Sequence, residues 1–123
     1  MKLSFIGLGA MGLPMAKALL DASYDIEAFD ISTGQMNAFR ALGGKIATSA
    51  RYTATGADVL LLMVLNAEQV ETLLFEQDCL AALADNATII VLSTLPPTYI
   101  QDLTRRLDTF SISLIDAPVS GGV

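Results

Sequence analysis

Histidine is absent from the 123-residue sequence, and cysteine occurs once, at Cys79. Zinc sites and Cys/His nucleophile pairs need histidine or several cysteines, and an internal disulfide needs two cysteines. The composition therefore predicts no metal site, no internal disulfide and no catalytic pair of these kinds. Cys79 is expected to be an inert helix or loop residue, and a chain so poor in cysteine suits the reducing cytoplasm.

Basic residues are also scarce, with seven lysines and arginines against thirteen acidic residues and a net charge of −6 at pH 7. Because no basic cluster occurs, the sequence excludes nucleic acid and an anionic membrane surface as partners. The longest apolar run, residues 59–65, is too short to cross a bilayer. Residues 2–18 resemble a signal peptide only superficially, since three glycines and a proline interrupt the apolar stretch.

Apolar residues, by contrast, make up 53% of the chain. Such a content in a chain of this length predicts a single domain whose sheet is covered on both faces. Six β-compatible segments alternate with helical ones, without a hairpin signal between them. We therefore predict an α/β fold of the Rossmann type, a doubly wound parallel sheet with strand order 3-2-1-4-5-6. The predicted strands are residues 2–6, 24–30, 45–47, 59–65, 87–92 and 111–115.

Two of the predicted helices have recognisable starts. Thr33 is placed to cap a helix that continues to about Leu42, where Gly43 and Gly44 end it. The Pro96-Pro97 pair starts the last helix. The inward-facing stripe of that helix is predicted to consist of Ile100, Leu103, Thr104 and Leu107.

Three glycines follow the first predicted strand with the spacing Gly7-x-Gly9-x-x-Gly12. Gly7 permits a tight turn out of the strand, Gly9 lets backbone N–H groups approach a phosphate, and Gly12 lets the following helix pack closely. The helix N-terminus then faces the anion. The sequence predicts that this turn binds a pyrophosphate, with Leu8, Ala10 and Met11 contributing backbone.

An acidic residue, Asp30, ends the second predicted strand eighteen positions after Gly12. This offset is close to the expected value of about 20 for the carboxylate that binds the adenosine ribose in such sites. A 2′-phosphate at this place would meet a like charge, and residues 31–33 include no arginine to accommodate it. The predicted cofactor is therefore NAD in preference to NADP.

The glycine motif and a second motif, DAPVSGG at residues 116–122, together resemble the β-hydroxyacid dehydrogenases. This family includes 3-hydroxyisobutyrate dehydrogenase, tartronate semialdehyde reductase and threonate dehydrogenase. The resemblance covers the whole chain. It implies that the cofactor also contacts the loop after the fourth strand and one position after the fifth strand. These residues are Val64, Leu65 and Asn66 for the adenosine half, and Thr94 near the nicotinamide.

Thr94 has a simpler alternative role as a helix N-cap, and the two roles can coexist. By the same resemblance, Ser120, Gly121 and Gly122 would bind the carboxylate of a small hydroxy-acid substrate. A glycine pair exposes N–H donors, and the serine adds a hydroxyl. The alternative for these three residues is an ordinary turn.

The family's reaction is reversible hydride transfer between a nicotinamide and a carbon that carries a hydroxyl group, assisted by a lysine in a helical second domain. The sequence ends before such a domain, and none of its lysines (Lys2, Lys17 and Lys45) is placed for catalysis. We therefore expect residues 1–123 to be the NAD-binding domain of a longer, cytoplasmic, homo-oligomeric dehydrogenase, with no catalytic residue in this chain. A non-catalytic NAD-sensing module and a flavin or S-adenosylmethionine site are the alternatives.

Overall fold

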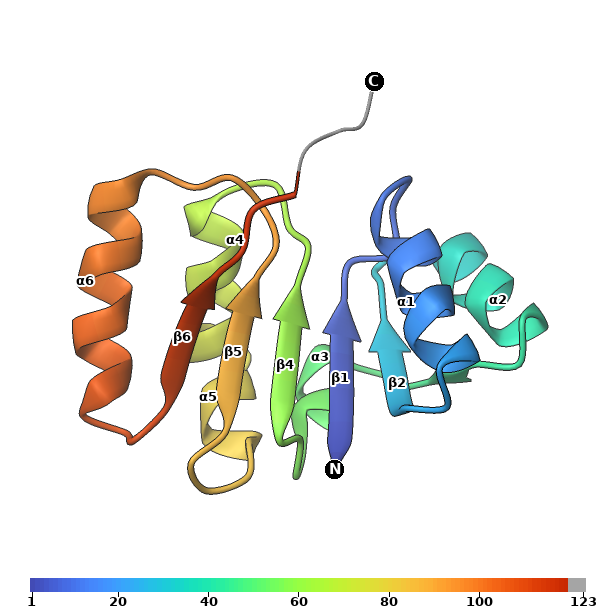
Figure 1. Ribbon diagram of the computed structural model, residues 1–123, viewed down its shortest axis with the longest axis horizontal. Coiled ribbons are helices and arrows are strands. Elements are labelled where there is room, and N and C mark those ends of the chain that lie inside the picture. Colours follow the sequence, from blue (N-terminus) through green and yellow to red (C-terminus); the bar gives the residue numbers. More distant parts are fainter. Residues whose placement is uncertain (120–123) are drawn as a thin grey trace.

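The computed structural model describes residues 1–119, which form one six-stranded sheet. Helices flank the sheet (Figure 1). All the strand pairs are parallel, and the spatial order is β3-β2-β1-β4-β5-β6, which confirms the predicted topology. The strands are β1 (Lys2–Ile6), β2 (Asp25–Phe29), β3 (Lys45–Ile46), β4 (Val59–Leu62), β5 (Thr88–Val91) and β6 (Ser113–Asp116). The helices are α1 (Gly12–Asp21), α2 (Thr33–Ala41), α3 (Ala50–Ala54), α4 (Ala67–Glu71), the π-helix η1 (Thr72–Glu76), α5 (Cys79–Ala82) and α6 (Pro97–Asp108).

The two faces of the sheet are built by alternating residues. Phe5 and Leu61 lie in the apolar cluster that also contains residues of α1 and α2, whereas Ile6 and Leu62 lie in the cluster that contains residues of the remaining helices. Phe5, Leu60 and Leu62 are fully buried. This arrangement follows from the period of two along a strand and from the continuous apolar sequence of β4.

The strands point the same way, so their carboxyl ends meet at one edge of the sheet (Figure 1). Ile6, at the end of β1, is in register with Phe29 of β2 on one side and with Leu62 of β4 on the other. The sequence order of the strands reverses at β1, so β1 and β4 flank the switch point. Ligands of doubly wound sheets bind beyond the strand ends at this point.

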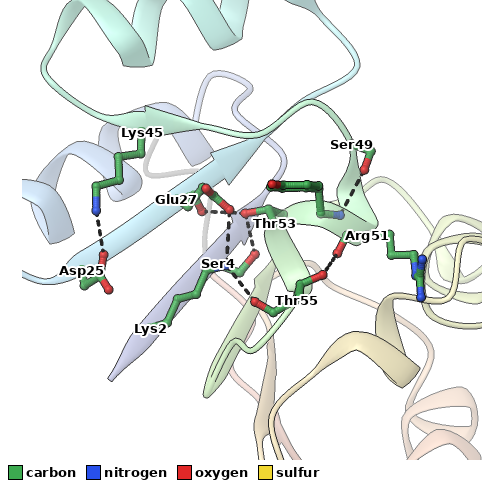
Figure 2. A network of polar contacts seen from close by, with 10 residues as sticks. Lys2, Ser4, Asp25, Glu27, Lys45, Ser49, Arg51, Thr53 and Thr55 are labelled. Carbon is green, nitrogen blue, oxygen red and sulfur yellow. Dashed lines mark hydrogen bonds and ion pairs between the residues drawn. The ribbon is translucent and has the colours of Figure 1, made fainter.

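A polar network connects α3 to the sheet (Figure 2). The Ser4 hydroxyl of β1 donates to Thr53 Oγ1 of α3 at 3.0 Å, and Thr53 Oγ1 donates to the backbone oxygen of Glu27 at 3.3 Å. Both hydroxyl-bearing side chains are fully buried. Because an unpaired hydroxyl is costly in such a place, the network fixes where α3 docks on the sheet.

Several details of the sequence prediction are wrong. Ser32, not Thr33, caps α2, because the Ser32 hydroxyl oxygen accepts from the N–H of Gln35. The strand expected over residues 59–65 ends at Leu62, since the chain leaves the sheet there to form a loop. Thr104 is exposed; the buried residues of α6 are Ile100, Leu103 and Leu107.

The helices formed by residues 1–119 are all too short or too polar to span a bilayer.

Candidate functional site

The turn between β1 and α1 is packed so tightly that two of its glycines have no room for a side chain. Gly7 adopts φ +108°, and a Cβ atom on it would lie 2.0 Å from the backbone oxygen of Met63. A Cβ atom on Gly12 would lie 1.8 Å from the backbone oxygen of Gly7. Glycine is therefore required at both positions, which brings β1, the end of β4 and the start of α1 together.

The third glycine of the motif is different. A Cβ atom on Gly9 would meet nothing within 4 Å, so the turn is open on this side. The first helical hydrogen bond runs from Leu13 N–H to Gly9 C=O at 3.0 Å, and within residues 1–119 the N–H groups of residues 9–12 have no acceptor. Met11, the N-cap residue of α1, offers no side-chain cap. Free amides and the positive end of the helix dipole make this turn suitable for an anion.

Asp30, directly after β2, is hydrogen-bonded to the same turn. Its Oδ2 accepts from the N–H of Leu8 at 2.7 Å, and its Oδ1 accepts from the N–H of Ser32 at 2.7 Å. Each carboxylate oxygen keeps a further lone pair for a ligand. The Leu8 side chain is fully buried, so this residue contributes to the site through its backbone.

A cavity of about 590 Å³ opens at the carboxyl edge of the sheet, between the turn and the loop that follows β4. Its size lies within the range of small-molecule sites, about 300–1,000 Å³. Six of the residues predicted from sequence line it: Gly7, Gly9, Asp30, Val64, Leu65 and Asn66. Sequence reasoning missed the other residues of the wall, among them Ile31, Glu68, Gln69, Thr72 and Gln77.

The loop after β4 is held in place by three polar contacts. The N–H of Val64 donates to Ser93 Oγ at 2.8 Å, and the N–H of Leu65 donates to Gln69 Oε1 at 2.8 Å. The Asn66 side chain caps α4 by accepting from the N–H of Gln69 at 2.9 Å. These contacts hold the part of the cavity wall that residues 64–66 form.

Two aliphatic side chains at the cavity are almost fully solvated. Ile31 is 92% exposed and Leu65 is 84% exposed. They come from the loops after β2 and β4, which flank the cavity. Apolar groups this exposed at a cavity rim can cover the flat face of an aromatic ligand. A single exposed isoleucine gives no periodic signal, so the sequence offered no means of finding Ile31.

Thr94 does not line this cavity. It is exposed in the loop between β5 and α6, and its alternative role as an N-cap is wrong, because the N-cap position of α6 is Pro96 and no side chain caps the helix. Ser120, Gly121 and Gly122 lie outside the described residues. Their assignment to substrate binding stays a prediction.

The charge of the site is negative rather than positive. Asp30 and Glu68 line the cavity, whereas each lysine of the described chain is paired with a carboxylate elsewhere: Lys2 with Glu27 at 3.4 Å, Lys17 with Asp21 at 2.5 Å and Lys45 with Asp25 at 3.2 Å. An anion bound in the turn would therefore be held by backbone dipoles. Within residues 1–119, no cluster of three metal-ligating side chains occurs either.

Comparison with known proteins adds family relationships to this geometry. A family model described as the NAD binding domain of 6-phosphogluconate dehydrogenase matches residues 2–123. The chain is 37% identical over 118 residues to L-threonate dehydrogenase of Cupriavidus necator, a match that covers 95% of this chain and 40% of that protein. It is 37% identical over 122 residues to NAD-dependent L-serine dehydrogenase of Pseudomonas aeruginosa, covering 98% of this chain and 41% of that protein.

Among solved structures, 3-hydroxyisobutyrate dehydrogenase of Salmonella typhimurium superposes with a TM-score of 0.91 at 30% identity, covering 98% of this chain and 42% of that one. The chain thus spans about 40% of the length of the relatives it matches. These similarities confirm the resemblance drawn from the glycine motif and the DAPVSGG segment.

Proposed function

The chain belongs to the family of the NAD binding domain of 6-phosphogluconate dehydrogenase, and from this premise we propose that it is the cofactor domain of a longer dehydrogenase that oxidises or reduces small hydroxy acids. The single observation that carries the proposal is the convergence of the glycine turn, Asp30 and the loop after β4 on one cavity. The open space at Gly9 and the free amides beside it suit a diphosphate.

The cofactor is proposed to lie across the carboxyl edge of the sheet. The N–H groups of residues 9–12 would bind the diphosphate, and Asp30 would accept hydrogen bonds from the adenosine ribose. Leu65, Asn66 and the neighbouring Val64 would contact the adenosine half, with Ile31 on the opposite rim.

The nicotinamide end is assigned by family resemblance alone. Thr94 is proposed to lie near the nicotinamide, and Ser120, Gly121 and Gly122 to bind the carboxylate of the substrate. A nicotinamide cofactor supplies hydride transfer, and this chain's residues bind and orient it. We assign no catalytic residue to the chain, because the lysines of the described part are engaged in ion pairs away from the cavity.

The activity of the whole protein is proposed from the relatives' names. Two of them are dehydrogenases named for threonate and for serine, and a third is named for 3-hydroxyisobutyrate. All three name small acids with a hydroxyl group. We therefore propose a small hydroxy acid as substrate, a cytoplasmic location and a homo-oligomeric parent. These names favour an enzyme's cofactor domain over a non-catalytic sensor, and the family description names NAD rather than a flavin or S-adenosylmethionine.

Preference for NAD over NADP is proposed from the surroundings of Asp30. A 2′-phosphate would face the carboxylate of Asp30, and the exposed side chain that follows it is the neutral Ile31. At an effective dielectric constant of about 20, two charges 4 Å apart repel by about 4 kcal/mol. This repulsion is enough to disfavour the phosphorylated cofactor.

Titration of the chain with NADH and NADPH, followed by cofactor fluorescence, tests the proposal. NADH is expected to show enhanced emission and a dissociation constant at least about tenfold lower than that of NADPH. Asp30→Ala should weaken NADH binding by about tenfold, because hydrogen bonds to a charged group contribute about 1.5–3 kcal/mol. Asp25→Ala, at the other end of the same strand, is the matched control and should leave binding unchanged. Absence of binding, or equal binding of both cofactors with no effect of Asp30→Ala, would contradict the proposal.

A further inference from the structure

Leu8, in the glycine turn, is held at both of its backbone polar groups by side chains from distant parts of the chain. Its N–H donates to Asp30 Oδ2 at 2.7 Å, and its C=O accepts from the side-chain amide of Gln35. Gln35 is partly buried and lies in the first turn of α2. Two neighbouring elements therefore fix the orientation of a residue that lies between Gly7 and Gly9.

The carbonyl group that Gln35 holds belongs to the same peptide unit as the N–H of Gly9. In a trans peptide the C=O and N–H bonds point in opposite directions, so fixing the Leu8 oxygen also fixes the direction of the Gly9 N–H. That N–H is the first of the free amides at the start of α1. Because Gly9 has no Cβ to restrict rotation, this peptide would turn over at little cost without the contact from Gln35.

Gln35 is in turn held by the residues that surround Asp30. Its backbone N–H donates to Ser32 Oγ at 3.3 Å, and the N–H of Ser32 donates to Asp30 Oδ1 at 2.7 Å. The contacts form a closed circuit from Asp30 through Ser32 and Gln35 to Leu8 and back to Asp30. The ribose-binding carboxylate and the phosphate-binding turn are thus parts of one hydrogen-bonded unit.

We propose that Gln35 is a positioning residue for the diphosphate, which it serves by holding the Leu8–Gly9 peptide with the Gly9 N–H directed away from α2 and toward the anion. This inference rests on the proposed NAD-binding function. Gln35 does not line the cavity, so its effect on the cofactor passes through the Leu8–Gly9 peptide. A preorganised donor of this kind spares the ligand the cost of ordering the turn.

Two substitutions of similar shape remove the donor in different ways. Gln35→Met keeps the length of the side chain without a polar hydrogen. Gln35→Glu keeps the shape, but its ionised carboxylate cannot donate and faces the Leu8 oxygen. Both variants should bind NAD about tenfold more weakly at pH 7.5, as expected for loss of one hydrogen bond. Binding of adenosine, which lacks phosphates, should change by less than about twofold. Asn37→Ala, an exposed change on the same helix, is the matched control and should leave both affinities unchanged.

The pH dependence of Gln35→Glu separates positioning from a general structural effect. As the pH falls toward 5, the carboxyl begins to protonate and regains a donor, since glutamic acid has an ordinary pKa of about 4.3. The ratio of NAD affinities between this variant and the wild type should then move back toward one. The corresponding ratio for Gln35→Met should stay constant over the same range.

The possible results distinguish failure of this inference from failure of the proposed function. If the wild-type chain binds no NAD, the proposed function itself is wrong. If the wild type binds NAD and Gln35→Met binds it equally well, only the positioning role is wrong. Equal losses of NAD and adenosine binding, or a Gln35→Glu affinity ratio that does not change with pH, would also overturn it. A thermal melt of each variant within about 2 °C of the wild type shows that the comparison concerns folded protein.

Discussion

The Arg106 guanidinium donates two hydrogen bonds to the Glu71 carboxylate, from Nη2 to Oε1 at 2.7 Å and from Nη1 to Oε2 at 3.2 Å. Glu71 is the last residue of α4, directly before η1, whereas Arg106 belongs to α6. The Tyr99 hydroxyl donates to the same carboxylate, and the guanidinium lies 4.4 Å from the centre of the Phe75 ring. Because Thr72 and Leu73 of η1 line the cavity, this cluster fastens a cavity wall to the last helix.

Low pH should weaken the ion pair between Glu71 and Arg106. Burial acts to raise the pKa of Glu71, but hydrogen bonds from Arg106 and Tyr99 and the charge of Arg106 outweigh it and lower that pKa. A carboxyl whose pKa is lower in the folded state stabilises the fold above its unfolded pKa, and this contribution is lost as the pH falls through the folded value. Glu71→Gln should therefore reduce the free energy of unfolding at pH 7, by no more than about 1 kcal/mol because the pair is about one-third exposed. The difference from wild type should shrink toward pH 3.

Urea unfolding of both proteins at pH 7 and pH 3 measures this difference. Glu68→Gln, on the exposed side of the same helix, is the control and should change stability little at either pH. A loss for Glu71→Gln that is the same at both pH values would contradict the electrostatic explanation, because protonation of Glu71 as the pH falls removes the charge that pairs with Arg106.

The three motif glycines should separate into two classes on substitution by alanine. Gly7→Ala and Gly12→Ala place a Cβ atom 2.0 Å and 1.8 Å from backbone oxygens, which cannot move aside as a flexible side chain can. Each should destabilise the fold by about 3 kcal/mol or more, or prevent folding, since backbone must shift. Gly9→Ala has open space and should change stability by less than about 1 kcal/mol.

The same Gly9→Ala variant should lose NAD affinity, because its methyl group occupies the space that the diphosphate would use. Circular dichroism melts and NADH titration of the three variants measure both effects. A Gly9→Ala protein that binds NADH like the wild type would remove the reason for placing the diphosphate beside this residue.

Much of the fold could be predicted from the sequence because its signals are local. Gly7 and Gly12 occupy positions where only glycine fits, and the apolar sequence of β4 is that of a strand buried on both faces. The order of the strands then follows from right-handed crossovers. Local signals could not decide where α2 begins. Ser32 and Thr33 both offer a capping hydroxyl, and only the backbone geometry selects Ser32.

The cavity was only half predictable for a related reason. Gly9 and Asp30 carry a motif, whereas Ile31 and Thr72 become cavity residues through tertiary placement alone. The contact between Gln35 and Leu8 joins residues 27 positions apart, and no sequence pattern predicts it. The π-helical turn of η1 likewise has no period that distinguishes it from an α-helix in sequence.

The buried hydroxyl groups of Ser4 in β1 and Thr53 in α3 should show coupling in a double-mutant cycle. Thr53→Val removes both the acceptor for Ser4 and the donor to the Glu27 backbone, so it should cost about 2 kcal/mol (Figure 2). Ser4→Ala leaves Thr53 bonded to Glu27 and should cost about 1 kcal/mol. The double variant should be more stable than the sum predicts, because Ser4 is no longer left unpaired. Strict additivity in denaturant unfolding would mean that the two hydroxyls do not interact.

Cys79 should behave as a protected thiol. It is fully buried at the start of α5, and burial, reinforced by the nearby charge of Asp78, raises its pKa to about 11. Since the thiolate is the reactive form, alkylation by iodoacetamide at pH 8 should be at least about a hundredfold slower in the folded chain than in urea. Rapid alkylation under native conditions would show that α5 opens or that the thiol is accessible.

The Cys79 thiol should also make the free energy of unfolding fall at alkaline pH. A thiol whose folded pKa exceeds the unfolded value contributes stability that is fully present below about pH 9, the unfolded value, and is lost as the pH rises toward 11. Cys79→Ala should cost about 1 kcal/mol at pH 7, because it leaves a small cavity in the core. This difference should diminish between pH 9 and pH 11, where only the wild type must keep an ionisable thiol neutral. Unfolding curves of the two proteins over this range decide the matter: a constant difference would mean that the thiol does not control alkaline stability.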